Sequence, residues 1–218
     1  MTRPLRPRSP LCDSHAEEVA STVTHGVGLA LSIAGLASML VVSRDDPWRV
    51  VSATVFGTTL VLLYASSTLY HAITGLRLKA FLQVLDHACI YLLIAGSYTP
   101  LTLVSLRGPW GWSLFGVVWG LAIAGVCLKF VVRGRKDGRI STAIYLAMGW
   151  LAVIAIGPMI RTLAPAALAW LVAGGLCYTL GTVFFAWQRL RFNHAIWHLF
   201  VLAGSACHVA AAAFHLLR

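Results

Sequence analysis

The sequence predicts an all-α integral membrane protein, a bundle of seven transmembrane helices, and three observations support this. The first is composition: 59% of the 218 residues are hydrophobic and 11% are charged, whereas soluble domains carry about 25% charged residues. The second is that the chain contains seven apolar stretches, each near the length of about 20 residues that a bilayer-spanning helix needs. The third is that the intervening segments are too short for another domain. Because lipid offers no partners to backbone groups, each stretch is expected to be helical.

The limits of the seven helices follow from hydropathy and from local signals. The expected ranges are 19–42, 49–71, 80–104, 111–132, 140–160, 166–187 and 194–216. Ser14 and Glu17 have the spacing of a capping box, which predicts that the first helix starts just before the membrane. Pro100 is expected to kink or end the third helix, and Gly157–Pro158 to bend the fifth. Short basic segments separate the second helix from the third, the fourth from the fifth and the sixth from the seventh.

The chain is expected to divide into two parts of different character. Residues 1–16, whose start is rich in arginine and proline, are predicted to be a disordered basic cytoplasmic arm. Residues 17–218 are predicted to form a single seven-helix transmembrane domain. No apolar segment precedes a small-residue cleavage site near the start, so we expect no removable signal peptide.

The basic residues predict the orientation of the bundle rather than a nucleic-acid partner. The net charge is +10, and with a cytoplasmic N-terminus twelve of the seventeen Lys and Arg residues lie inside and five outside. The inner set is Arg3, Arg6, Arg8, Arg77, Lys79, Lys129, Arg133, Arg135, Lys136, Arg139, Arg189 and Arg191. The outer set is Arg44, Arg49, Arg107, Arg161 and Arg218. This positive-inside pattern predicts a multi-pass protein of the inner (plasma) membrane with its C-terminus outside, whose cytoplasmic basic segments meet anionic lipid headgroups.

Titratable residues from three predicted helices fall at one depth of this bundle. His194 and His198 are four residues apart on one face of the seventh helix. His71 closes the second helix and Asp86 opens the third, so all four lie near the cytoplasmic leaflet. Because titratable groups are costly inside a bilayer, their coincidence indicates a function. An isolated histidine pair would instead be interpreted as packed residues that hydrogen-bond between helices.

Three imidazoles with one open position predict a metal site with His71, His194 and His198 as ligands. This donor set suits tetrahedral zinc of the catalytic type, although Fe(II), Mn(II) and Ni(II) also accept imidazole ligands. Asp86 is expected to contact the cation, either as a ligand or through bound water. The alternative is an interfacial aspartate that hydrogen-bonds a neighbour such as His87.

Three further residues are candidates for supporting roles. Ser67 precedes His71 by one turn and would orient a metal-bound water or a substrate oxygen, unless it only bonds back to its own helix. Glu18 and His25 are seven residues apart on one face of the first helix, where they would border the site through a hydrogen bond. Interfacial snorkelling and helix packing are the alternative for both.

Three motifs occur in a characteristic order along the chain. They are Ser67-Thr-Leu-Tyr-His71, Asp86 within Leu-Asp-His-Ala-Cys-Ile-Tyr-Leu-Leu-Ile-Ala-Gly-Ser-Tyr-Thr-Pro, and His194-Ala-Ile-Trp-His198. Their order and the seven-helix frame resemble those of the haemolysin III family, the bacterial branch of the progestin and adipoQ receptor proteins. The likeness runs from about residue 17 to the end of the chain.

The resemblance implies a fold, a ligand set and a chemistry. Relatives such as the adiponectin receptors have seven spans, an intracellular N-terminus and zinc held by three histidines, which correspond to His71, His194 and His198. The resemblance implies that Asp86 holds the metal-bound water and that Ser67 lies beside it. Alkaline ceramidases, in the wider superfamily, hydrolyse a lipid amide with the same arrangement. Bacterial members were named for haemolytic activity and are linked to membrane homeostasis.

Three functions are compatible with these observations. The first is a zinc-dependent hydrolase of a membrane lipid, a ceramide-like amide or an acyl ester, in which Asp86 is the general base. The second is a non-catalytic membrane-homeostasis sensor in which zinc ties helices together and a lipid is a ligand. The third is a pore-forming cytolysin. A pore would need polar residues along several helices, whereas here they gather at one end.

Overall fold

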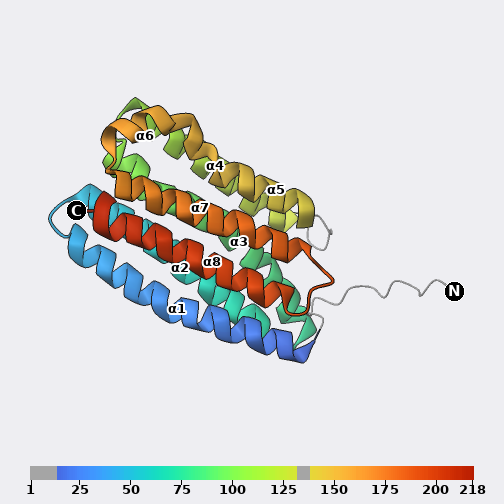
Figure 1. Ribbon diagram of the computed structural model, residues 1–218. Helices are drawn as coiled ribbons and strands as arrows, with labels where there is room; N and C mark the ends of the chain where they lie inside the picture. Colours follow the sequence, from blue (N-terminus) through green and yellow to red (C-terminus); the bar gives the residue numbers. More distant parts are fainter. Residues whose placement is uncertain (1–13, 132–137) are drawn as a thin grey trace.

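The computed structural model describes residues 14–131 and 138–218, and within these ranges every regular element is a helix. The helices lie side by side in one elongated bundle (Figure 1). Their bounds are α1 His15–Ser43, α2 Pro47–Ala72, α3 Leu76–Pro100 with its extension η1 Leu101–Ser105, α4 Pro109–Val131, α5 Gly138–Gly149, η2 Leu151–Ala155, α6 Ile156–Thr162, α7 Pro165–Ala186, and α8 Asn193–Ala211 with its extension η3 Ala212–Leu216.

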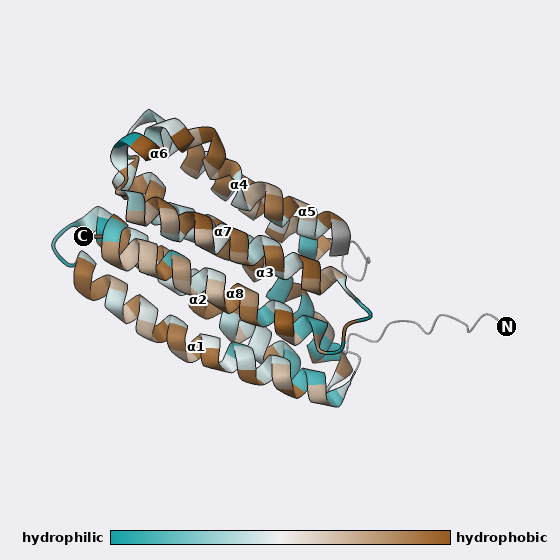
Figure 2. Cartoon of the chain, in the orientation of Figure 1, coloured by the Kyte–Doolittle hydropathy of each residue, from teal (hydrophilic) through white to brown (hydrophobic). Residues whose placement is uncertain are grey.

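These elements make seven units that are long and apolar enough to cross a membrane, which confirms the predicted fold class. The elements α5, η2 and α6 together form the fifth unit. Large apolar side chains such as Leu31, Val117 and Leu176 point outwards, and hydrophobic colours run along the helices in Figure 2. Such a surface would be exceptional on a soluble protein and suits contact with lipid. The orientation of the bundle in the membrane stays a prediction from the charges.

Most of the predicted N-terminal arm, residues 1–13, lies outside the described residues. The same holds for six of the basic residues assigned to the inner side, which are Arg3, Arg6, Arg8, Arg133, Arg135 and Lys136. The described chain begins at the predicted cap: the Ser14 hydroxyl accepts the N–H of Glu17 at 3.2 Å, and α1 begins at His15. The expected start of the first helix is therefore confirmed.

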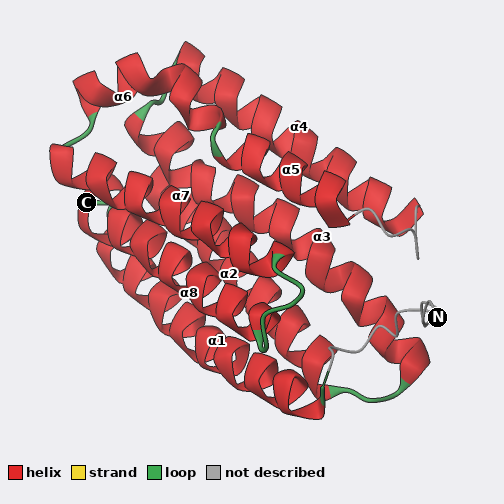
Figure 3. Ribbon diagram, turned by 45° about the vertical axis from the view of Figure 1, so that its right-hand side comes forward, coloured by secondary structure: helices red, strands yellow, loops and turns green. Residues whose placement is uncertain are grey.

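The packing order places the first and last helices of the described chain side by side. Helix α1 packs on α2 and α8, α2 on α3, α3 on α4, and α7 on α8. Figure 1 shows α1, α2 and α8 on one side of the bundle and α4, α5 and α6 on the other, with α3 and α7 between them. The connections between successive helices are short (Figure 3). Consequently the start of α1, the end of α2 and the start of α8 meet at one end of the molecule.

Two helices are interrupted near their prolines. The α-helix α3 ends at Pro100, as expected, and the third unit continues to Ser105 as the π-helical η1. The fifth unit breaks before Gly157–Pro158 rather than at it, because the 3₁₀ segment η2 occupies Leu151–Ala155. A proline removes the N–H that would bond the carbonyl four residues earlier. This accounts for the loss of α-helical bonding just before Pro158.

A tyrosine from α3 explains why the break extends back to Gly149. The Tyr98 hydroxyl lies 3.0 Å from the carbonyl oxygen of Met148 and 2.7 Å from that of Gly149. It also accepts the N–H of Ala152 at 2.9 Å. One side chain thus satisfies backbone groups that the broken helix leaves unpaired, which lipid could not do. Helices are commonly interrupted where a side chain inserts into the backbone ladder.

Close helix contacts in the bundle depend on glycines at particular positions. A Cβ on Gly96 of α3 would collide with the hydroxyl of Thr59 on α2, and a Cβ on Gly125 of α4 with the ring of Tyr91. By contrast, a Cβ on Gly120 of α4 would meet nothing within 4 Å. The small residue at Gly96 therefore allows α2 and α3 to approach closely.

We expect Gly96→Ala to destabilise the protein and Gly120→Ala, its matched control, to leave stability unchanged or slightly improved. Overpacking costs about 1–3 kcal/mol, which should lower the unfolding midpoint by roughly 2–10 °C in a chain of this size. The measurement is thermal unfolding of both variants in detergent. Equal midpoints for the two variants would contradict the close contact between α2 and α3.

Candidate metal centre

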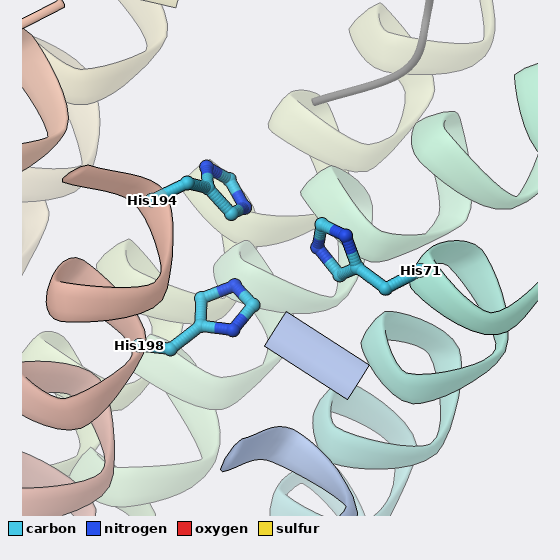
Figure 4. A group of neighbouring side chains, drawn as sticks. All are labelled: His71, His194 and His198. Carbon is cyan, nitrogen blue, oxygen red and sulfur yellow. The ribbon is translucent and has the colours of Figure 1, made fainter. Parts of the chain in front are cut away.

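Three histidines from two helices converge near the end of the bundle where α1 begins. His71 lies in the last turn of α2, and His194 and His198 lie in the first turns of α8. One ring nitrogen from each can be chosen so that all three lie within 4.8 Å of one another. The ring centroids are 5.0, 5.1 and 4.6 Å apart, and Figure 4 shows the rings turned towards a common space. The structure therefore brings together the three predicted ligands.

The free ring nitrogens show that this donor set fits a metal ion. The Nε2 atoms of His71, His194 and His198 are buried and have no hydrogen-bond partner among the described residues. Leaving a buried polar group unpaired costs about 1–3 kcal/mol, so three together call for a common partner. Two nitrogens on one tetrahedral zinc lie about 3.4 Å apart, so side-chain movements of about 1 Å would suffice. These three residues could hold a divalent metal.

Glu18 orients one of the three rings. Its Oε2 accepts the Nδ1–H of His71 at 2.8 Å, which leaves His71 Nε2 as the nitrogen that faces the other two histidines. Carboxylates that fix the tautomer of a ligating histidine in this way are common around metal sites. The expected contact of Glu18 with the site is therefore present, and it is direct.

Lys79 completes this arrangement and was not expected to take part in the site. Its ammonium lies 3.2 Å from Glu18 Oε1 and donates to the carbonyl oxygens of Tyr70 at 2.7 Å and Ile73 at 3.2 Å. It is 1% exposed. From the sequence, Lys79 was one of the inner-side charges that set topology. Hydropathy gave no signal for this contact, because the expected third helix starts at residue 80. In the structure α3 begins at Leu76, so Lys79 lies inside the helix and reaches the end of α2.

Glu17 supports the start of α8 from α1. Its Oε1 accepts the backbone N–H of His194 at 3.2 Å. The residue before the helix, Phe192, has a φ of 60° and provides no side-chain cap. Glu17 therefore satisfies one of the unpaired N–H groups of α8, and its charge is favourably placed at a helix N-terminus. From the sequence, Glu17 was expected only to cap its own helix.

Two residues of α1 contact His198. Thr24 Oγ1 lies 3.3 Å from His198 Nδ1. The His25 ring stacks on the His198 ring with centroids 3.4 Å apart and planes 10° from parallel. His25 also contacts the Tyr64 ring edge-on at 5.0 Å, and both of its nitrogens are buried without a hydrogen-bond partner in the described chain. His25 thus borders the site through stacking, and the expected hydrogen bond is not formed.

Asp86 and Ser67 lie beside the histidines but outside the group of three. Asp86 is 4% exposed and Ser67 is fully buried. The Asp86 carboxylate interacts electrostatically with His71 and lies close to the Ser67 hydroxyl. That hydroxyl has no hydrogen bond of ordinary geometry to any described residue. Asp86 is consequently placed next to a potential metal site rather than among its nearest three donors.

A cavity of about 210 Å³ leads away from Asp86 and His25. It runs between α3, α5, α7 and α8, and apolar residues such as Leu93, Met159 and Leu171 form most of its wall. Its polar residues include His87 and Lys129 and also Ser97, Thr179 and His208. The arrangement therefore combines a potential metal site, a buried carboxylate and an apolar space. Chemically, it can activate water beside an elongated apolar ligand.

His208 does not belong to this centre, although it lies in the same helix as two of the ligands. Its ring stacks on that of Tyr178 at 5.6 Å and fits against Gly174, whose Cβ would collide with it. At 1.5 Å per residue, His208 lies about 15 Å from His198 along α8, too far to share a metal ion with it.

Comparisons with known proteins agree with the fold and with the motif order. The family model for haemolysin-III related proteins matches residues 14–209. The chain is 45% identical over 203 residues to hemolysin-3 of Bacillus cereus, covering 92% of each. It is 42% identical over 204 residues to the hemolysin-3 homolog of Bacillus subtilis (strain 168), covering 93% of this chain and 95% of the relative. The human monocyte to macrophage differentiation factor is 32% identical over 217 residues, covering 96% and 87% respectively.

We expect purified protein to contain a stoichiometric divalent metal that His198→Ala and His71→Ala remove. His208→Ala is the matched control, because it also deletes a buried ring yet lies outside the cluster, so it should retain the metal. Elemental analysis by mass spectrometry measures the content. Equal metal in the His198 and His208 variants would exclude the site.

Glu18→Gln is expected to weaken metal binding by about 10–100-fold, the usual effect of losing the carboxylate behind a ligating histidine. Competition with a fluorescent chelator measures the affinity. Glu17→Gln is the control: it changes the neighbouring carboxylate in the same way but keeps a carbonyl oxygen for the N–H of His194. The same loss in both variants would show that Glu18 acts only through the overall charge of the site.

Proposed function

We propose that this chain, which belongs to the haemolysin III-related family, is a metal-dependent hydrolase that cleaves an acyl bond of a membrane lipid. The observation that carries the proposal is that several features needed for such a reaction lie close together. Three buried imidazole nitrogens lie beside the buried carboxylate of Asp86, and that carboxylate in turn lines an apolar cavity. The substrate class we favour is a ceramide-like amide or an acyl ester, and zinc is the metal that best suits three histidines with an open position.

Each residue of the site has a distinct part in this reaction. When bound, a divalent ion would polarise the acyl carbonyl and make water more acidic. Zinc lowers the pKa of water from about 15.7 to about 7. Asp86, the one acid among the described residues that line the cavity, takes the proton from the attacking water and returns it to the leaving group. The hydroxyl of Ser67 donates to the negative charge that develops on the carbonyl oxygen.

The surrounding residues keep this geometry in place. The chain from Lys79 through Glu18 to His71 holds one ring in a single tautomer. Glu17 fixes the start of α8, and His25 limits the movement of His198 by stacking on it. The apolar cavity would receive the acyl chain and keep bulk water away from the reacting bond. With the predicted orientation, substrate would enter from the inner leaflet of the plasma membrane, consistent with a role in membrane homeostasis.

A non-catalytic sensor is the second candidate, and one feature favours it. The ligands come from α2 and α8, and Glu17, Glu18, Thr24 and His25 of α1 contact them. A metal would therefore tie three helices together even if nothing were hydrolysed. One relative is named hemolysin-3 and another hemolysin-3 homolog. A pore has less support, since the buried charged residues of the described chain, which are Glu17, Glu18, Lys79 and Asp86, cluster at one end of the bundle. Membrane conductance that persists in His198→Ala would favour a pore.

Asp86→Asn should abolish lipid hydrolysis while leaving the metal content near that of the wild type, because the amide cannot accept the proton. The measurement is release of fatty acid from ceramide and from phospholipid in reconstituted vesicles. Asp45→Asn is the matched control, since Asp45 is exposed and pairs only with Arg44 at 3.8 Å among the described contacts; it should remain fully active. An active Asp86→Asn variant would rule out the base, and metal without any turnover in the wild type would favour the sensor.

A further inference from the structure

A second group of polar residues borders the same cavity, apart from the three histidines. Lys129 lies in the last turn of α4, and its ammonium donates to the hydroxyl of Ser141 on α5 at 2.6 Å. The hydroxyl of Tyr145 on α5 donates to the backbone carbonyl of His87 on α3 at 2.9 Å. Lys129, Ser141, Tyr145 and His87 all line the cavity. The proposed hydrolysis uses none of them.

The charge of Lys129 distinguishes this group from ordinary packing. It is the one lysine or arginine among the described residues that line the cavity. A lysine near a membrane interface usually extends its ammonium into water. Here the ammonium reaches the hydroxyl of a buried serine on the neighbouring helix. The positive charge therefore borders a mostly apolar space, where electrostatic interactions are stronger than in water.

One residue that lines the cavity relates this cation to the histidine centre. The His87 ring interacts electrostatically with both Lys129 and His71, and it also interacts with His194. His87 is therefore near the lysine and near two of the candidate metal ligands. A ligand that reaches the histidines from the apolar part of the cavity would bring any polar headgroup close to Lys129.

We propose that Lys129, Ser141 and His87 form a subsite for the phosphate of an anionic lipid whose acyl chain occupies the apolar part of the cavity. An ammonium, a hydroxyl and an imidazole are all able to donate hydrogen bonds to phosphate oxygens. The apolar wall beyond them selects a lipid over a soluble phosphate. The inference rests on the proposed function only in that the cavity holds a lipid. Of the amides and acyl esters proposed as substrates, it selects those whose headgroup carries a phosphate.

The test compares binding of two lipids that differ in the phosphate. Full-length protein in a neutral detergent is titrated with palmitoyl lysophosphatidic acid and with monopalmitoylglycerol. The wild type should bind the phosphate-bearing lipid at least about tenfold more tightly, the effect of one hydrogen bond to a charged group. Lys129→Met should lose this preference, and Lys129→Arg should recover most of it. Arg189→Met, which removes an exposed positive charge, is the matched control and should keep the preference.

Each alternative result has a definite meaning. Equal affinities for the two lipids in the wild type, or a preference that survives in Lys129→Met, would overturn the subsite. Inorganic phosphate that binds as tightly as the lysolipid would overturn its assignment to a lipid. Unchanged metal content and unfolding midpoint in Lys129→Met confirm that a loss of preference is local. A Lys129-dependent preference without hydrolysis would support the subsite and reject the enzyme, whereas hydrolysis without any preference would do the reverse.

Discussion

The hydrogen bond between Glu18 and the Nδ1–H of His71 is the interaction on which the geometry of the site depends. It links α1 to α2, and the second carboxylate oxygen of Glu18 contacts Lys79 of α3. A buried ion pair of this kind contributes little net stability, but removing one partner commonly costs about 3–5 kcal/mol because the other charge is left unpaired. The pair therefore fixes one arrangement of three helix ends. That arrangement leaves Nε2 of His71 turned towards α8.

The bundle separates two tasks between its two sides. Helices α1, α2 and α8 supply the histidines and the groups that hold them, whereas α3, α5 and α7 contribute most of the apolar wall. Asp86 on α3 lies where the two sides meet. Titratable groups inside a bilayer are usually costly, and here most of the charged ones have partners within the protein. The histidine nitrogens that lack partners coincide with the place where a cation fits.

The ligands could be predicted from sequence because they follow from simple periodicity and from charge. His194 and His198 share a helical face, and the distribution of Lys and Arg placed His71 at the same depth. Lys79 could not be recognised, since a buried lysine and a loop lysine look alike next to an apolar segment. The break in the fifth unit was misplaced because its extent depends on Tyr98, which comes from another helix. The cross-helix bond of Glu17 likewise depends on tertiary contact that local spacing does not encode.

The separation of the ligands along the chain has a consequence for assembly. His71 lies in the second of the seven membrane-crossing units, whereas His194 and His198 lie in the seventh. His71 therefore emerges from the ribosome long before the other two histidines. Until this final helix is inserted, one of the three candidate ligands is present, and one imidazole holds a cation only weakly. Metal binding at this site would therefore be a late event in biogenesis. A chain truncated before α8 would span the membrane repeatedly and lack two of the three candidate ligands.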